Sequence, residues 1–269
     1  MEYLPPQPQT EPAPKKAKRK PSGAIGAAAA AVLAFLLKFK VLLVGLKLLA
    51  PMWPFLLSFW LYIVFFGWKL AIVIVLLLLA HELGHYFAFR AYGLPVRLPV
   101  FVPLLGAFTA GAVPDDMEHD AYIALAGPLV GLGLAAACYA IGDTTSNRFW
   151  LACADLSAFL NLFNMIPTPP FDGGRVVAAL WPPLWIGGFV LFILFAIYMH
   201  VPIFFIAIIA LLGVPAILSS WRGHVDPRAA RMTFAGRLRV SLWYLATVAG
   251  LVYVMALSHA GIGPLQAAN

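Results

Sequence analysis

The segment His81–His85 has the sequence HELGH and ends an unbroken apolar run, Leu70–Ala80. On a helix, residues four apart project from the same face, so His81 and His85 can bind one Zn²⁺ while Glu82 stands beside it. Zinc polarises a carbonyl and acidifies water, and Glu82 could then carry a proton from that water to a leaving amine. Ionisable groups are costly in a bilayer, so three of them beside a hydrophobic span indicate a metal or a water-filled cavity. The segment is therefore typical of metal-dependent peptide hydrolysis.

A catalytic zinc usually has three protein ligands and one open position, so a third donor is required. Asp172 is the candidate, because it ends the sequence NMIPTPPFDGG at Asn164–Gly174, where an apolar span breaks into prolines. A non-helical break that carries an acid suits the wall of a cavity. The alternative is that Asp172 is an ordinary N-cap of the next helix. The residues alone leave both interpretations open.

The elements that must position these residues are apolar helices. The chain has 269 residues, of which 62% are hydrophobic and 11% charged, and its apolar runs are continuous rather than alternating. The net charge of +7 gathers at the flanks of apolar segments, where the positive-inside rule predicts the cytoplasm and anionic lipid headgroups are the expected partners. We predict an all-α polytopic membrane protein and exclude a nucleic-acid-binding function.

Composition divides the chain into five parts. Residues 1–22 form a Pro-rich, basic tail, predicted to be disordered and cytoplasmic, and 23–50 an interfacial or partly inserted helical segment. Residues 51–220 form the catalytic membrane core. A basic cytoplasmic loop is predicted at 221–239, and a C-terminal transmembrane helix and tail at 240–269.

About seven transmembrane helices are predicted from these runs. They are residues 51–66, 68–90, 121–141, 149–166, 183–198, 202–220 and 240–258. Whether 23–37 also spans the membrane stays open, and an eighth span there would change the topology. With the tail inside, the span 68–90 runs inward and ends near Arg90 and Arg97, which agrees with the charge bias.

Between the second and third spans, Val96–Val113 has the composition of extended chain. Pro99 and Pro103 oppose a helix, and Gly106 and Gly111 permit tight turns. We predict a short membrane-embedded β-hairpin or a re-entrant loop. Such backbone must be shielded by protein or line a wet cavity, because lipid cannot satisfy its amides.

The position of the histidines predicts the depth of the metal. The helix from Lys69 to His81 is about 18 Å long and that from His85 to Arg90 only about 8 Å, at roughly 1.5 Å per residue. The active site should therefore lie within the membrane, nearer the cytoplasmic side. The span 149–166 also runs inward, so Asp172 can reach a similar level.

The other polar residues favour structural roles. Five of them form a cluster interpreted as a solvated loop: Asp115, Asp116, Glu118, His119 and Asp120. Asn161 is mid-span, so we expect a structural hydrogen bond there. Arg175 could stabilise Asp172 or anchor its segment at the headgroups, and anchoring is the favoured interpretation.

These residues resemble the site-2 proteases, a family of intramembrane zinc metalloproteases. The resemblance is carried by HELGH at His81–His85, by the pattern N-x-x-P-x-x-P-F-D-G-G at Asn164–Gly174, and by AGP at Ala126–Pro128. It implies that His81, His85 and Asp172 are zinc ligands, that Glu82 is the catalytic acid and base, and that Asn164 positions substrate or the oxyanion. It also implies that Val96–Val113 is the family's hairpin, to which an unwound substrate could add as a strand. No stretch is long enough for a PDZ insertion or a C-terminal CBS pair, so we expect a minimal form of the family.

The predicted function is a zinc endopeptidase that cleaves a transmembrane segment of another membrane protein, in a prokaryotic cell membrane. A membrane metal-ion transporter is one alternative, since histidines and a carboxylate within spans also fit ion passage. The other is a non-catalytic, zinc-containing binder of transmembrane helices. Neither alternative needs Glu82 beside the ligands.

Overall fold

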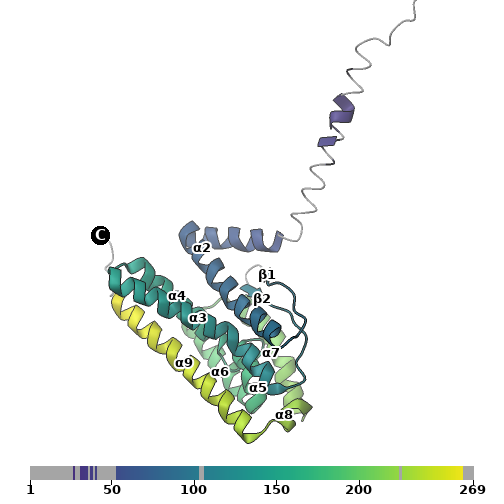
Figure 1. Cartoon of the computed structure of the whole chain (residues 1–269), viewed down its shortest axis with the longest axis vertical. Helices are drawn as coiled ribbons and strands as arrows, with labels where there is room; N and C mark the ends of the chain where they lie inside the picture. The colour runs from purple at the N-terminus through teal and green to yellow at the C-terminus, as the bar shows by residue number, and fades with distance from the viewer. Residues whose placement is uncertain are drawn as a thin grey trace, which may run out of the picture. The chain divides into compact units, whose positions relative to one another are not determined.

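The computed structural model describes residues 53–102, 106–223 and 226–262, together with residues 27, 31–35, 37, 38 and 40. The chain divides into two units, Met1–Trp53 and Pro54–Asn269. In the first unit the described residues are helical. The tail predicted at 1–22 lies outside the described residues, and the interfacial placement of 23–50 stays a prediction. The second unit holds the helices and strands labelled in Figure 1.

The first long helix of this unit, α2 (Trp53–Ala91), is broken at Gly67, where φ is 77° and ψ is 161°. Glycine enters this region without steric cost because it has no Cβ. The break falls between the predicted spans 51–66 and 68–90, and the two parts of α2 run in different directions (Figure 1). The second part carries His81–His85 near its C-terminal end.

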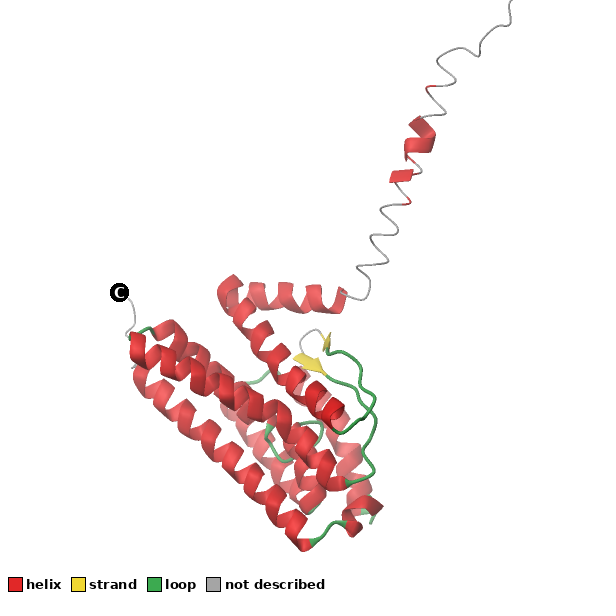
Figure 2. Ribbon diagram, viewed as in Figure 1, coloured by secondary structure: helices red, strands yellow, loops and turns green. Residues whose placement is uncertain are grey.

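A small antiparallel hairpin follows α2. Strands β1 (Val100–Val102) and β2 (Gly106–Phe108) pair with Phe101 opposite Ala107. Val96 forms an isolated bridge with Gly111, which extends the pairing toward the hairpin base. The hairpin predicted from Val96–Val113 is thus confirmed, and Figure 2 shows it beside α2.

Three long helices of the second unit pack side by side: α3 (Met117–Thr145), α4 (Arg148–Asn164) and α9 (Phe234–Ile262). Asn147 ends the short turn between α3 and α4, and its side chain accepts a hydrogen bond from the Phe149 N–H at 3.0 Å. The interfaces contain fully buried small residues, among them Ala121, Ala124 and Ala158. Small side chains let helix backbones approach closely, which is how helices associate where lipid supplies no hydrophobic drive.

Four further helices complete the unit: α5 (Asp172–Leu180), α6 (Leu184–Tyr198), α7 (Ile203–Trp221) and α8 (Pro227–Arg231). Among the described residues, four helices are long and apolar enough to cross a membrane, namely α2, α3, α7 and α9. Helix α6 is apolar but has 15 residues, and α4 has 17. The fold is therefore helical and rich in membrane-spanning candidates, and the count of about seven spans stays a prediction.

Two boundaries from the sequence are wrong. The predicted solvated loop 115–120 is partly helix, because α3 begins at Met117 and Asp116 caps it by accepting from the Glu118 N–H at 2.8 Å. The predicted loop 221–239 contains α8 and the start of α9, which begins at Phe234. The charged residues at the start of α9 are compatible with a helix because Arg237 and Arg239 donate to protein oxygen atoms. The C-terminal helix therefore starts before residue 240.

Candidate metal centre

His81, Glu82 and His85 are buried on the second part of α2, with 4%, 6% and 5% of their surface exposed. Their helical spacing places the two imidazole rings together, with ring centroids 4.8 Å apart and the rings nearly perpendicular. Close packing of α2 on α3 makes this burial possible. A Cβ on Gly84 would lie 2.6 Å from the Ala126 carbonyl oxygen, so only glycine allows the backbones to approach this closely.

Asp172 reaches the histidines from a distant part of the chain. It is the first residue of α5, after Phe171 at the N-cap, so the N-cap interpretation of Asp172 is wrong. Its Oδ2 lies 3.1 Å from His81 Nε2 and 3.1 Å from His85 Nε2, and the two Nε2 atoms are 3.1 Å apart. The structure therefore brings three potential ligand atoms of the predicted set to one point.

The hydrogen bonds behind the rings decide which nitrogen carries the proton. The Asn161 Nδ2 donates to the Ser157 carbonyl at 2.7 Å, so Asn161 Oδ1 faces His81 Nδ1, also at 2.7 Å. His85 Nδ1 lies 2.7 Å from the Ile123 carbonyl oxygen. Both oxygens can only accept, so each Nδ1 is the donor and, in the neutral imidazoles, each Nε2 presents a lone pair.

Two lone pairs and a carboxylate oxygen therefore face one another in a buried site. Such a group of acceptors is unfavourable unless a cation or a proton lies among them. Atoms bound tetrahedrally to one zinc at its usual bond lengths lie roughly 3.4 Å apart, close to the three separations of 3.1 Å. The residues present thus fit a zinc ion in donor type, protonation and spacing.

Glu82 differs from the two histidines because one of its side-chain polar atoms makes no hydrogen bond to the described residues. Its Oε2 is buried and has no hydrogen-bond partner among the described residues. Burial of an unpaired carboxylate oxygen is costly, so its retention beside a metal-type site suggests chemistry rather than structure. The hairpin lies close by, since the Thr109 hydroxyl donates to the backbone carbonyl of Glu82 at 3.1 Å.

The two asparagines at the end of α4 have different surroundings. Asn164, the predicted catalytic residue, is the last residue of α4 and half-buried, and within the described part of the chain its side chain makes no hydrogen bond. Asn161 contacts His81 directly. The sequence predicts a structural hydrogen bond for Asn161 but not its partner. The signal in the sequence that could have pointed to this contact was an amide side chain within an apolar span, three residues before the pattern that begins at Asn164.

Gly127 on α3 leaves room beside the imidazole nitrogens. A Cβ there would lie 2.9 Å from His81 Nε2 and closer still to His85 Nε2. We therefore expect Gly127→Ala to displace the rings and remove bound zinc, as measured by metal analysis of the purified protein. Gly133→Ala on the same helix is the control, because a Cβ there meets nothing within 4 Å. Equal zinc content in the two variants would contradict this placement.

Asn161 should influence metal affinity through His81. Partners of metal-binding histidines typically change affinity about 10–100-fold when removed, so Asn161→Ala is expected to weaken zinc binding by that factor in a chelator competition. Ser157→Ala is the matched control, since it loses a buried hydrogen bond to Gly131 but keeps the carbonyl that holds Asn161. An affinity equal to that of the control would show that Asn161 does not orient His81.

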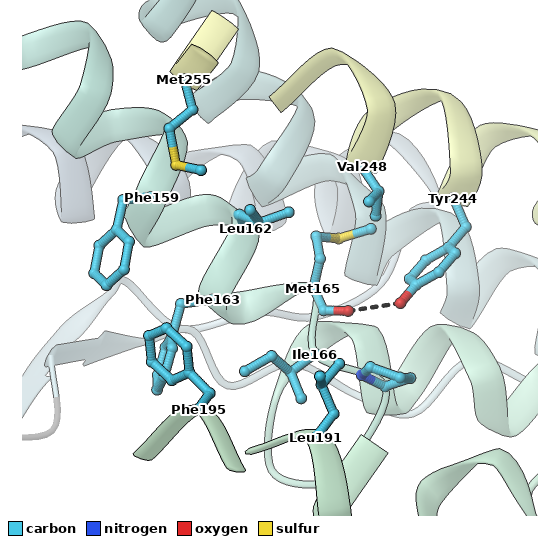
Figure 3. Close-up of a pocket in the computed structure, with 11 residues that line it drawn as sticks. Phe159, Leu162, Phe163, Met165, Ile166, Leu191, Phe195, Tyr244, Val248 and Met255 are labelled. Carbon is cyan, nitrogen blue, oxygen red and sulfur yellow. Dashed lines mark hydrogen bonds between the residues drawn. The ribbon is translucent and has the colours of Figure 1, made fainter. Parts of the chain in front are cut away.

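A separate apolar cavity of about 410 Å³ lies between α4, α6 and α9 (Figure 3). Its lining includes Met165 and Ile166, which follow Asn164, and the Tyr244 hydroxyl donates to the Met165 carbonyl at 2.6 Å. None of the residues that line it is a histidine or an acid. The cavity is therefore distinct from the candidate metal centre.

Comparison with known proteins supports the resemblance. The family model described as peptidase family M50 matches residues 69–148, a range that includes His81–His85 but not Asp172. Zinc metalloprotease Rip3 of Mycobacterium tuberculosis is 37% identical over 123 residues, which cover 41% of this chain and 30% of that protein. Zinc metalloprotease MJ0392 of Methanocaldococcus jannaschii is 30% identical over 118 residues, which cover 41% of this chain and 34% of that protein. The matched part thus spans about a third of each relative, and the resemblance predicted from the motifs is confirmed.

Proposed function

Because its residues 69–148 match peptidase family M50, we propose that this chain is an intramembrane zinc endopeptidase of the site-2 protease type. It hydrolyses a peptide bond within or near a transmembrane segment of another membrane protein. His81, His85 and Asp172 hold the zinc ion, and Glu82 is the catalytic acid and base.

The observation that carries this proposal is the group of three acceptor atoms around one point. His81 Nε2, His85 Nε2 and Asp172 Oδ2 are each 3.1 Å from the others, while both Nδ1 atoms donate to oxygens. A zinc ion at this point would satisfy all three acceptor atoms, and two imidazoles with one carboxylate form a common donor set of zinc hydrolases. The two zinc metalloproteases similar to this chain support the same metal.

The residues divide the chemistry between them. Zinc bound here would polarise the scissile carbonyl and make a nearby water acidic. The free carboxylate of Glu82 takes the proton of the attacking water and delivers it to the leaving amine. Asn161 and the Ile123 carbonyl keep the two rings in the tautomer that presents Nε2 to the ion.

We assign substrate positioning to Asn164 and the hairpin. A helical substrate must unwind before attack, because its amides are sheltered by hydrogen bonds, and an extended segment could pair with a strand edge. The hydrogen bond from Thr109 to the Glu82 carbonyl ties the end of β2 to the helical turn that carries Glu82.

Because Asn164 is assigned to substrate positioning and not to zinc binding, Asn164→Ala should keep its zinc but lower kcat, measured by metal analysis and by turnover of a reconstituted substrate. Unchanged turnover would remove Asn164 from the mechanism.

The proposal places the protein in a prokaryotic cell membrane with about seven spans and the active site nearer the cytoplasmic side. Four described helices long and apolar enough to cross a membrane support this placement. The basic residues of 221–239 and the N-terminal tail are assigned to the cytoplasm. Lipid surrounds the apolar outer faces.

Proteoliposomes test this function against metal transport. The full chain is reconstituted with a single-span test protein, and the products are identified by mass spectrometry. We expect cleavage within or near the span, its loss after zinc chelation, and its return when zinc is restored. Zinc entering the vesicles without any cleavage of a panel of single-span proteins would favour a transporter instead.

A further inference from the structure

Helix α5 is short and carries Asp172 as its first residue, so the contacts that hold α5 also set the place of this carboxylate. A helix of 9 residues is not stable alone and depends on its neighbours. Arg175, one turn after Asp172, donates from Nη2 to Asp120 Oδ1 at 2.6 Å. Neither sequence interpretation of Arg175 described this contact, which pairs Arg175 with an acid of α3.

Asp120 is the centre of a larger cluster. Its other carboxylate oxygen, Oδ2, accepts from Arg228 Nη2 of α8 at 3.2 Å. Arg228 also pairs with Asp226 at 2.7 Å and donates to the Pro114 carbonyl at 2.5 Å. The side chain of Asp120 is only 14% exposed. Two acids and two arginines balance in charge, and the hydrogen bonds from Arg228 hold the pKa of the Asp226 carboxyl below its usual range.

Helix α3 connects this cluster to the histidines. Asp120 is followed three residues later by Ile123, whose carbonyl accepts from His85 Nδ1 at 2.7 Å. One rigid turn of α3 therefore contacts both halves of the metal centre: His85 of α2 through Ile123, and α5 through Asp120 and Arg175. The relative position of Asp172 and the imidazoles depends on this turn.

We propose that Asp120, Arg175 and Arg228 are positioning residues, which set Asp172 at the distance from His81 and His85 that a zinc ion requires. The inference rests on the proposed function, because it assumes that His81, His85 and Asp172 bind zinc. Functional groups must be held within about 0.5 Å of their working geometry. A small shift of α5 should therefore weaken binding of the zinc ion without removing any ligand.

The test measures zinc affinity of the full chain in detergent, by competition with a chromophoric chelator. Arg175→Ala and Asp120→Asn are expected to bind zinc about 10–100-fold more weakly than the wild type. Arg175→Lys should bind with intermediate affinity, since it keeps the charge but not the guanidinium geometry. Arg239→Ala is the matched control, because it breaks the ion pair with Glu118 in the same turn of α3 without touching α5.

The unfolding temperature of each metal-free variant separates positioning from stability. A purely structural role would lower that temperature while zinc affinity stayed at the wild-type value, and this result would overturn the inference. If Arg175→Ala does not fold, Arg175→Lys and Asp120→Asn decide by the same comparison. A wild type that binds zinc through His81, His85 and Asp172 but cleaves nothing would contradict the proposed function and leave the inference standing.

Discussion

Replacing Glu82 with glutamine is expected to lower kcat by about 10²–10⁴-fold, the usual contribution of a general acid and base, while the protein keeps its zinc. Glutamine has nearly the shape of glutamate but cannot accept the proton of the attacking water. Glu82 Oε2 has no hydrogen-bond partner in the described part of the chain, so the substitution breaks no hydrogen bond at that atom. Cleavage of a reconstituted single-span substrate and metal analysis of the same sample measure the two effects.

Glu118→Gln is the control for this substitution. Glu118 lies in the first turn of α3 and pairs with Arg239, away from the imidazoles, so its variant should cleave at nearly the wild-type rate. Zinc-replete Glu82→Gln with wild-type turnover would exclude Glu82 from the chemistry. The non-catalytic binder considered from the sequence would cleave nothing even as the wild type, and its binding of transmembrane helices would be unchanged by this substitution.

Replacing His85 with alanine is expected to abolish both zinc binding and cleavage. The wild type should hold about one zinc per chain, as a site with three protein ligands implies. The variant loses one ligand, and the Ile123 carbonyl loses its donor. The two remaining ligands cannot hold the ion against a chelator, so zinc content should fall close to zero in metal analysis after dialysis.

His259→Ala provides the comparison for the loss of an imidazole. The side chain of His259 is 82% exposed and lies 3.8 Å from Asp155, so its removal should leave zinc and turnover unchanged. If His85→Ala retained one zinc per chain, the ion would have to bind elsewhere and the proposed site would be wrong.

The local features of this chain follow from the sequence because they depend on neighbouring residues. The helical face of His81 and His85, the break at Gly67 and the hairpin within Val96–Val113 all reflect short-range rules. Helix ends were less predictable. The acids at 115–120 have the composition of a loop, yet Asp116 caps α3 and Glu118 pairs with Arg239 of α9.

The contacts that assemble the site join residues far apart in the chain. Asp172 meets His81 across 91 positions and Asn161 meets it across 80. Composition can nominate such residues as costly polar groups within apolar spans, but packing of the helices decides which partners they find. The residues alone nominated Asp172 as a third ligand but left the N-cap alternative open, and the family resemblance favoured the ligand role. Nothing in the residue pattern indicated that Arg175 would pair with Asp120.

Zinc-edge X-ray absorption of the purified full chain tests the central claim most directly. The account predicts one zinc with two imidazole nitrogens and oxygen ligands at about 2.0–2.2 Å, and the loss of this spectrum in Asp172→Ala. Zinc bound through sulfur, for which the free thiols of Cys138 and Cys153 are available, would contradict it. An imidazole signal unchanged by removal of Asp172 would contradict it as well.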